Sequence, residues 1–263
     1  MRKVRKSIYH LERADGAWAR VLLTAVLAAY RVWDRLVLRR ASRMDLASEK
    51  IVSHEKRFLC VVVPKSGSRT LIGGFEAAAY RHGFDVTLHE RPIDAFLDGY
   101  EGYATFAVVR DPWSRVYSCY KQKLVRATPI TKARTLHGRR GLHASMSFDA
   151  FVRWLATPDG RDEVADRHWM SQTKILGLDR GMTYDVIGRL DAFDEALDAI
   201  AERVGIPTDV FAHELRTTRP DEYLTHYTPE LVQMVAERYA EDVARFGFEP
   251  PQLAAAGRGP ADP

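Results

Sequence analysis

The sequence predicts an α/β fold, a three-layer domain in which helices flank a mostly parallel central sheet. Short apolar runs have the length and Val-rich composition of strands that are buried on both faces. Segments with helical periodicity separate these runs, as in repeated strand–helix units. The runs cover residues 58–63, 84–88, 105–109 and 184–190. The chain has 263 residues, of which 46% are hydrophobic and 28% charged, and this is ordinary composition for a globular domain.

The chain divides into three predicted parts: a basic helical segment over residues 1–50, one domain over 51–250 and a flexible tail over 251–263. In the first part, apolar residues recur at helical spacing between arginines. Its longest uncharged run, residues 21–30, is shorter than the ~20 residues that span a bilayer. The pattern predicts a helix that packs on the domain or lies on an anionic membrane surface.

The composition argues against several classes of protein. A net charge of +4 is too small to indicate nucleic-acid binding. Cys60 and Cys119 have neither CxxC nor metal-ligand spacing, which predicts buried thiols in a reducing compartment. No cluster of residues has the spacing of a metal site, so we expect none.

The first strand runs directly into a turn of small and polar residues, and a predicted helix over residues 71–82 follows. Free N–H groups at a helix start, together with the helix dipole, favour an anion such as phosphate or sulfate. The candidate contacts are Lys65, Ser66, Gly67, Ser68, Arg69 and Thr70. The arrangement is P-loop-like, but Lys65 comes first, whereas GxxxxGK[ST] places its lysine late. The alternative is an ordinary turn with a solvated lysine.

The second strand ends at His89 and Glu90. Ligands of open α/β sheets bind outside the carboxyl ends of the strands, so both residues are expected on the same rim as Lys65. Histidine has a suitable pKa for taking a proton near neutrality. The alternative is a hydrated loop histidine.

The third strand is followed by Arg110, and Asp111 with Pro112 predicts a helix start with Asp111 as N-cap. Arg110 at the strand tip and Ser118 on the helix predict a site for a second phosphate group. Arg115 is a further candidate for binding substrate. A structural ion pair is the alternative for both arginines.

Residues 121–147 contain no acidic side chain and many basic ones. This run predicts a basic lip for an anionic acceptor, or a solvated loop. Aromatic residues are not interleaved with it, which argues against nucleic acid. The candidate acceptor contacts are Lys121, Lys123, Arg126, His168 and Trp169. For the last two, a satisfied histidine and a structural tryptophan are the alternative.

Three further helices have predicted N-caps, at Ser147, Asp191 and Thr228. Gly83 and Gly205 are predicted to end helices.

The motifs VPKSGSRTL and VVRDPWSRVYSCY resemble the two nucleotide-binding motifs of the sulfotransferases, with Arg110 and Ser118 eight residues apart as in that family. The details resemble the carbohydrate enzymes of the chondroitin and heparan 2-O types. The segment His168-Trp169-Met170-Ser171-Gln172 is similar to their HWxxQ element. The ending over Tyr239, Asp242 and 246–248 is similar to their C-terminal helix. The Ala- and Arg-rich composition suggests a bacterial, cytoplasmic member, with peripheral contact at the inner membrane face as an option.

The resemblance implies that adenosine 3′-phosphate 5′-phosphosulfate (PAPS) is the sulfuryl donor, and that a carbohydrate or glycoconjugate hydroxyl is the acceptor. It implies that the first motif holds the 5′-phosphosulfate and that Arg110 and Ser118 hold the 3′-phosphate. Sulfuryl transfer resembles phosphoryl transfer, so Lys65 would neutralise charge on the leaving oxygen. By position His89 resembles the catalytic histidine of the heparan 2-O type, and Glu90 is the competing base. No metal is required.

Two other classes of function stay open. A P-loop-like kinase would need a magnesium-holding Ser or Thr after its lysine, and the order of this loop argues against it. A non-catalytic protein could bind anions or membranes through its basic segments.

Overall fold

The computed structural model describes residues 49–90, 99–136, 139–207, 211 and 222–253. The predicted N-terminal helix and residues 254–263 of the predicted tail lie outside the described residues. Within the described residues, no helix is both long enough and apolar enough to cross a bilayer.

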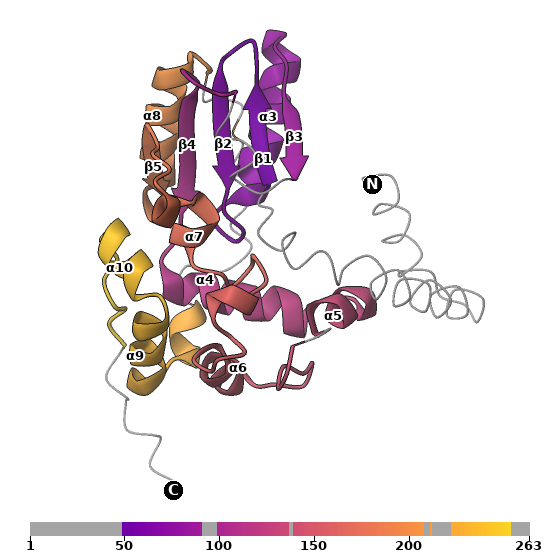
Figure 1. Cartoon of the computed structure of the whole chain (residues 1–263), viewed down its shortest axis with the longest axis vertical. Coiled ribbons are helices and arrows are strands. Elements are labelled where there is room, and N and C mark those ends of the chain that lie inside the picture. Colours follow the sequence, from indigo (N-terminus) through magenta and orange to yellow (C-terminus); the bar gives the residue numbers. More distant parts are fainter. Residues whose placement is uncertain (1–48, 91–98, 137–138, 208–210, 212–221, 254–263) are drawn as a thin grey trace, which may run out of the picture.

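A five-stranded sheet forms the centre of the fold, in the order β3-β1-β2-β4-β5 (Figure 1). The strands are β1 (Glu49–Ser53), β2 (Phe58–Val62), β3 (Thr87–Glu90), β4 (Ala104–Val109) and β5 (Val186–Arg189). The pairs β2–β4 and β4–β5 are parallel, whereas β1 pairs antiparallel with both β2 and β3. Four of the five strands therefore run in the same direction, and the mixed α/β architecture agrees with the prediction.

Strand β1 was not predicted. It forms a hairpin with β2 and lies between β2 and β3, which makes β3 an edge strand. Lys50, the second residue of β1, is fully buried, and a lysine at this position gives no sign of a buried strand in the sequence. The predicted second strand over 84–88 is shifted, because β3 begins only at Thr87.

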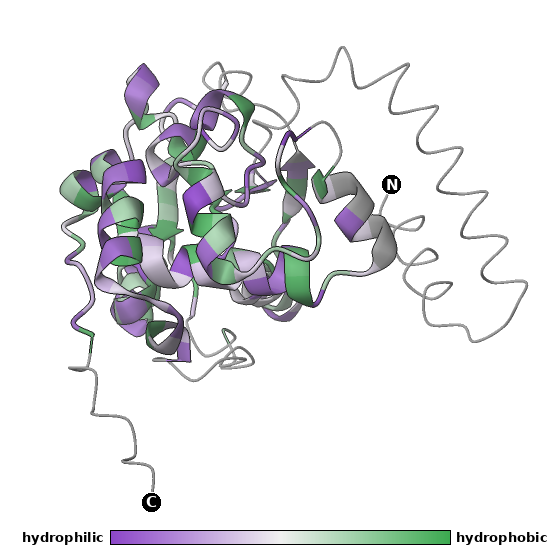
Figure 2. Ribbon diagram, turned by 90° about the horizontal axis from the view of Figure 1, so that it is seen from below, coloured by the Kyte–Doolittle hydropathy of each residue, from purple (hydrophilic) through white to green (hydrophobic). Residues whose placement is uncertain are grey.

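Helices cover both faces of the sheet. The side chains of Phe58, Cys60 and Val62 pack towards α3 (Ser68–His82) and α8 (Phe193–Val204). The alternate residues of β2 face the opposite layer, which contains α4 (Pro112–Tyr120), α6 (Phe148–Leu155) and α9 (Pro229–Arg238). This alternation is the two-residue period of a strand buried on both sides. In Figure 2, hydrophobic and hydrophilic bands alternate along the surrounding helices, as expected for helices with one buried face.

The remaining helical elements are short. They are the π-helical turn η3 (Lys121–Val125), α5 (Pro129–Leu136), η4 (Asp162–Val164), α7 (Gln172–Leu176), η5 (Leu178–Arg180), η6 (Leu190–Ala192), η8 (Glu222–His226) and α10 (Ala240–Phe246).

Most predicted helix ends are confirmed. The side chains of Asp111, Ser147 and Thr228 each accept a bond from the backbone N–H three residues on, at 2.8, 3.1 and 3.3 Å. Gly83 and Gly205 end their helices in the left-handed conformation. The predicted cap at Asp191 is wrong. Helix α8 begins at Phe193 without a side-chain cap, and the Asp191 carboxylate instead pairs with Arg189 at 2.6 Å.

Candidate functional site

The loop between β2 and α3 presents backbone N–H groups to an anion. Lys65 and Gly67 both have left-handed backbones, with φ of 75° and 72°, and Ser66 N–H bonds to the Val63 carbonyl at 3.2 Å. The first intrahelical bond of α3 runs from Leu71 N–H to the Gly67 carbonyl. The N–H groups of residues 68–70 therefore have no acceptor within the helix, and no acidic residue occupies the first turn. Such a terminus favours a bound anion.

Gly67 is required for the conformation of this loop. A Cβ atom there would lie 3.1 Å from Leu190 Cδ1 and 3.4 Å from Phe193 Cε2. The positive φ adds backbone strain for any L-residue with a side chain. The loop is thus held tightly against the start of α8.

Lys65 is the cation of this loop. Its Nζ donates to Gln122 Oε1 at 2.8 Å, and Gln122 comes from the π-helical turn after α4. Burial lowers the pKa of Lys65 to about 8, and the nearby cations Arg110 and Arg69 act in the same direction. An anion bound beside Lys65 would reverse this shift, so the site favours a negative ligand electrostatically.

Arg110 connects the second predicted motif to the first. Its Nη1 donates to the Lys65 carbonyl at 3.1 Å, and its Nε donates to Ser114 Oγ at 2.7 Å. Burial lowers the pKa of Arg110 from its ordinary value. Ser118, the predicted partner of Arg110, lies one helical turn beyond Ser114 and is half-buried. The structure thus brings Arg110 to the Lys65 loop but places Ser114 nearer to its guanidinium.

Gln172 was not among the predicted site residues, yet it joins both motifs. Its Oε1 accepts from Arg110 N–H at 2.9 Å and from Ser66 Oγ at 3.3 Å, while its Nε2 donates to the Arg110 carbonyl at 2.7 Å. The side chain is fully buried. The sequence marked Gln172 only as the last residue of the HWxxQ element. That position does not by itself reveal which residues Gln172 contacts.

Asp242 holds Gln172 in position. Its carboxylate accepts from Gln172 N–H at 2.8 Å, and from the N–H and hydroxyl of Thr173 at 2.8 and 2.9 Å. Burial raises the pKa of Asp242, although these three bonds oppose the shift. The C-terminal helix α10 therefore supplies the N-terminal acceptor of α7, 70 residues earlier in the chain.

The structure corrects the prediction that Arg115 binds substrate. Arg115 is 1% exposed. Its guanidinium donates to the carbonyls of Pro64, Met170 and Arg167 at 3.2, 2.8 and 3.4 Å. Backbone carbonyls, and not the ion pair predicted as the alternative, are the hydrogen-bond partners of the Arg115 guanidinium. Arg115 instead ties the anion loop to the segment before α7.

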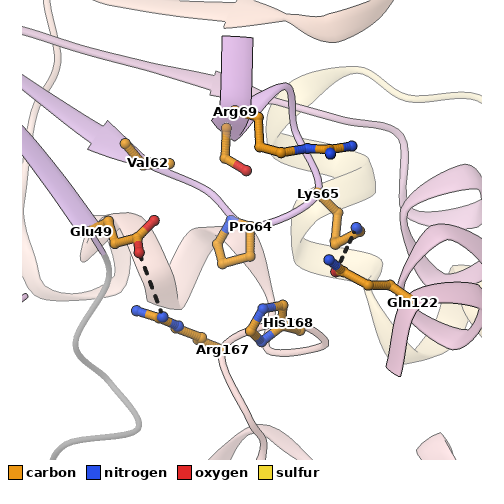
Figure 3. A pocket seen from close by; sticks show the side chains of 9 residues that line it. Glu49, Val62, Pro64, Lys65, Arg69, Gln122, Arg167 and His168 are labelled. Carbon is orange, nitrogen blue, oxygen red and sulfur yellow. Dashed lines mark hydrogen bonds and ion pairs between the residues drawn. The ribbon is translucent and has the colours of Figure 1, made fainter. Parts of the chain in front are cut away.

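A pocket of about 130 Å³ opens beside the loop (Figure 3). Its lining residues come from β1, β2, the loop, α3, η3 and the segment before α7. They are Glu49, Val62, Pro64, Lys65, Ser68, Arg69, Gln122, Arg167 and His168. Figure 3 shows Arg167 paired with Glu49, at 3.9 Å. Positive groups outnumber negative ones in this lining, which suits an anionic ligand.

The two residues of the HW dipeptide have different environments. His168 lines the pocket, and its Nδ1 lies 2.5 Å from Asp166 Oδ1. Trp169 is 1% exposed and packs edge-on against Phe151 and Trp154 in the core. The structural alternative therefore holds for Trp169, and the prediction that it contacts substrate is wrong.

The two bases predicted from sequence are the last residues of β3, and the backbone of Glu90 is paired opposite Glu49, which lines the pocket. His89 is opposite Lys50 on β1, which in turn is opposite Val61 on β2, so His89 is two strands, or about 10 Å, from β2. Its Nε2 lies 3.0 Å from Thr87 Oγ1. Glu90 ends β3, and its side chain lies outside the described residues. His89 is not among the described residues that line the pocket.

The predicted basic lip is partly occupied by protein contacts. Lys121 pairs with Glu222 and lies over the Tyr117 ring, 5.6 Å from its centroid. The charge of Lys123 lowers the pKa of both Lys65 and His168. Arg126 is exposed. Lys123 is thus electrostatically coupled to the pocket, whereas Lys121 is engaged elsewhere. Among the residues that the structure describes, no group of three or more His, Cys, Asp or Glu side chains is arranged to hold a metal ion.

Comparison with known proteins adds an independent finding. A family model described as "Sulfotransferase family" matches residues 48–249. Carbohydrate sulfotransferase 14 of Danio rerio is 25% identical over 254 residues, which cover 84% of this chain and 67% of the relative. Carbohydrate sulfotransferase 10 of Danio rerio is 23% identical over 194 residues, covering 64% of this chain and 50% of the relative. Its Xenopus laevis counterpart is 22% identical over 176 residues, covering 57% and 48%. The chain thus spans about half the length of these two relatives. No solved structure matches it.

Proposed function

Because this chain belongs to the sulfotransferase family, we propose that it transfers a sulfuryl group from PAPS to a hydroxyl of a carbohydrate or glycoconjugate. The carbohydrate class of the acceptor comes from the names of the similar proteins, two of which are carbohydrate sulfotransferases 14 and 10. PAPS is the donor that the family resemblance implies.

The observation that carries the proposal is the contact between the two anion-binding motifs. Arg110 donates to the carbonyl of Lys65, and Gln172 bonds to both Arg110 and Ser66. A cation at each of two adjacent strand ends, plus the free N–H groups of residues 68–70, suits a ligand with two separate anionic groups. PAPS carries such groups at its 5′ and 3′ positions.

The residues present fit the charges of this donor. The P-loop-like turn would hold the 5′-phosphosulfate through the N–H groups of residues 68–70 and the Lys65 ammonium. Arg110 would hold the 3′-phosphate, with Ser118 as the predicted second contact and Ser114 already beside the guanidinium.

The reaction is a displacement at sulfur. The acceptor oxygen forms a bond to sulfur while the bond from sulfur to the phosphate oxygen breaks, and negative charge develops on that oxygen. Lys65 and the helix N–H groups stabilise this charge, because they are fixed in place before the reaction. The acceptor must lose its hydroxyl proton, and His89 and Glu90 remain the bases predicted from sequence.

The acceptor is proposed to be anionic. Residues 121–147 contain no acidic side chain, and Lys123 acts electrostatically on the pocket. Contact of the N-terminal segment with a membrane surface stays a prediction.

Thermal denaturation with adenosine 3′,5′-bisphosphate tests the donor site, beside 5′-AMP and Mg-ATP. A ligand at a hundred times its dissociation constant stabilises the folded state by ~2.7 kcal/mol, and this shifts the melting temperature by roughly 5–10 °C for a chain of this size. A shift with the bisphosphate alone supports the proposal. A shift with Mg-ATP alone favours the kinase alternative.

The substitution Lys65→Ala distinguishes an enzyme from a non-catalytic anion-binding protein. For the enzyme, this change should abolish sulfuryl transfer, while Arg110→Ala should mainly weaken nucleotide binding. Transfer that persists in Lys65→Ala would contradict the proposed role of Lys65.

A further inference from the structure

We propose that His168, oriented by Asp166, is the general base that takes the proton from the acceptor hydroxyl. This inference rests on the proposed function, since it assigns a catalytic role at the same pocket. It replaces His89 and Glu90, the bases predicted from sequence, with a residue that the sequence indicated only as a weak acceptor contact.

The first argument is the fixed geometry of the imidazole. Asp166 Oδ1 lies 2.5 Å from Nδ1 of His168 and also accepts from its backbone N–H at 2.9 Å. Asp166 is itself held by Arg139, at 3.8 Å. The carboxylate therefore fixes the proton on Nδ1 and leaves Nε2 as the basic nitrogen, the arrangement in which a histidine acts as general base.

The second argument is location. His168 lines the same pocket as Lys65, which is the residue proposed to stabilise the leaving oxygen (Figure 3). Its side chain is 19% exposed, and its Nδ1 is bonded to Asp166. An acceptor hydroxyl that enters the pocket can thus approach both the donor group held near Lys65 and a basic nitrogen.

Burial keeps His168 neutral before the donor binds. Burial lowers the pKa of His168 to about 4, with Lys123 and Arg167 acting in the same direction and Asp166 opposing them. A neutral imidazole at pH 7 is able to accept a proton. The donor's negative charge would offset Lys65, Lys123 and Arg167, so the basicity of Nε2 should rise when PAPS is bound.

In the proposed step, the acceptor O–H bond breaks and its proton moves to Nε2 of His168. The oxygen lone pair forms the new bond to sulfur, and the electron pair of the breaking S–O bond stays on the phosphate oxygen of adenosine 3′,5′-bisphosphate. The imidazolium is stabilised by Asp166 and returns its proton to solvent after the product leaves.

His89 has a different position in the sheet. It lies on the edge strand, two strands from β2, and its Nε2 is 3.0 Å from Thr87 Oγ1. It is not among the residues that line the Lys65 pocket.

The test measures release of adenosine 3′,5′-bisphosphate from PAPS, with water alone and with unsulfated chondroitin and heparosan as acceptors. His168→Gln should lower kcat by about 10²–10⁴-fold with little change in the donor KM. The same substitution should also abolish the increase of kcat with pH that results from deprotonation of the general base. Asp166→Asn should lower kcat too, because the imidazole loses its orienting carboxylate. His82→Gln on the exposed end of α3 is the matched control and should keep the wild-type rate.

A structural role for His168 is excluded by two further measurements. The bisphosphate should raise the melting temperature of His168→Gln as much as that of the wild type, and added imidazole should restore part of the rate of His168→Gly. An unchanged rate in His168→Gln, a loss confined to His89→Gln, or a loss of bisphosphate binding in His168→Gln overturns the inference. No bisphosphate shift in the wild type would instead mean that the proposed function itself has failed.

Discussion

Gln172 binds the main chain of Arg110 through both atoms of its amide, accepting from the N–H at 2.9 Å and donating to the carbonyl at 2.7 Å. The Gln172 side chain thus bonds to the main chain just after β4 in the way that a paired strand would. Because the same Oε1 also accepts from Ser66 Oγ, one buried side chain fixes the distance between the two anion-binding motifs. This relationship makes the donor site sensitive to a residue that need not touch the donor.

Gln172→Leu should destabilise the protein and weaken donor binding together. The substitution leaves the buried N–H and carbonyl of Arg110 without partners, at about 1–3 kcal/mol for each group. We expect a loss of about 2–6 kcal/mol in the free energy of unfolding by urea denaturation. Calorimetry should show weaker binding of adenosine 3′,5′-bisphosphate. Gln233→Leu, at an exposed position of α9, is the control and should change neither quantity.

Gly67→Ala should be destabilising, whereas Gly73→Ala in the same helix should not. At Gly67, φ is +72° and the new Cβ would lie 3.1 Å from Leu190, so strain and a close contact add to about 1–2 kcal/mol. Nothing lies within 4 Å of a Cβ at Gly73, and alanine in a helix interior is favoured by about 0.5–1 kcal/mol. Equal melting temperatures of the two variants would contradict this account of the loop.

Donor binding should weaken as pH rises through the pKa of Lys65. Burial lowers that pKa to about 8, so the free protein loses this cation above pH 8. The phosphate groups of the bisphosphate are already ionised in that range, since their second pKa is about 6. Calorimetric affinities between pH 7 and 9.5 should therefore fall for the wild type. Lys65→Arg should show no such fall, because its guanidinium stays charged.

Arg115→Lys should lower stability rather than acceptor affinity. The lysine keeps the charge but cannot bond to the carbonyls of Pro64, Met170 and Arg167 at the same time. We expect about 2–4 kcal/mol of destabilisation, from the loss of charged hydrogen bonds at a buried site. Arg161→Lys, whose side chain is 62% exposed, should be neutral. A rise in acceptor KM with unchanged stability would restore the original prediction for Arg115.

The stability of the protein should fall in mild acid because of His168. Its pKa is about 4 in the folded state and about 6.5 in an unfolded chain. The unfolded state therefore binds more protons between these values, and stability is lost as pH falls from 6.5 towards 4, by up to about 1.4 kcal/mol per pH unit. Urea denaturation across this range should give a flatter profile for His168→Gln.

Much of the fold follows from local signals in the sequence. The apolar runs predicted β2, β4 and β5, and the capping residues Asp111, Ser147 and Thr228 each begin a helix as expected. The prediction of a cap at Asp191 was wrong because a carboxylate near a helix start can form an ion pair instead, here with Arg189. Strand β1 was missed because charged residues at its start conceal it.

For the candidate site, the sequence by itself determined the loop around Lys65 and the position of Arg110 at the next strand end. Both depend on local order along the chain: a strand, a turn with small residues and a helix start. The tertiary structure alone decided which distant side chains meet them. It buried Arg115 and Trp169, inserted β1 between β2 and β3, and brought Gln172 and the His168–Asp166 pair to the loop. These contacts join residues far apart in the chain, and their partners are set by packing and by the need to satisfy buried polar groups, which no local pattern encodes.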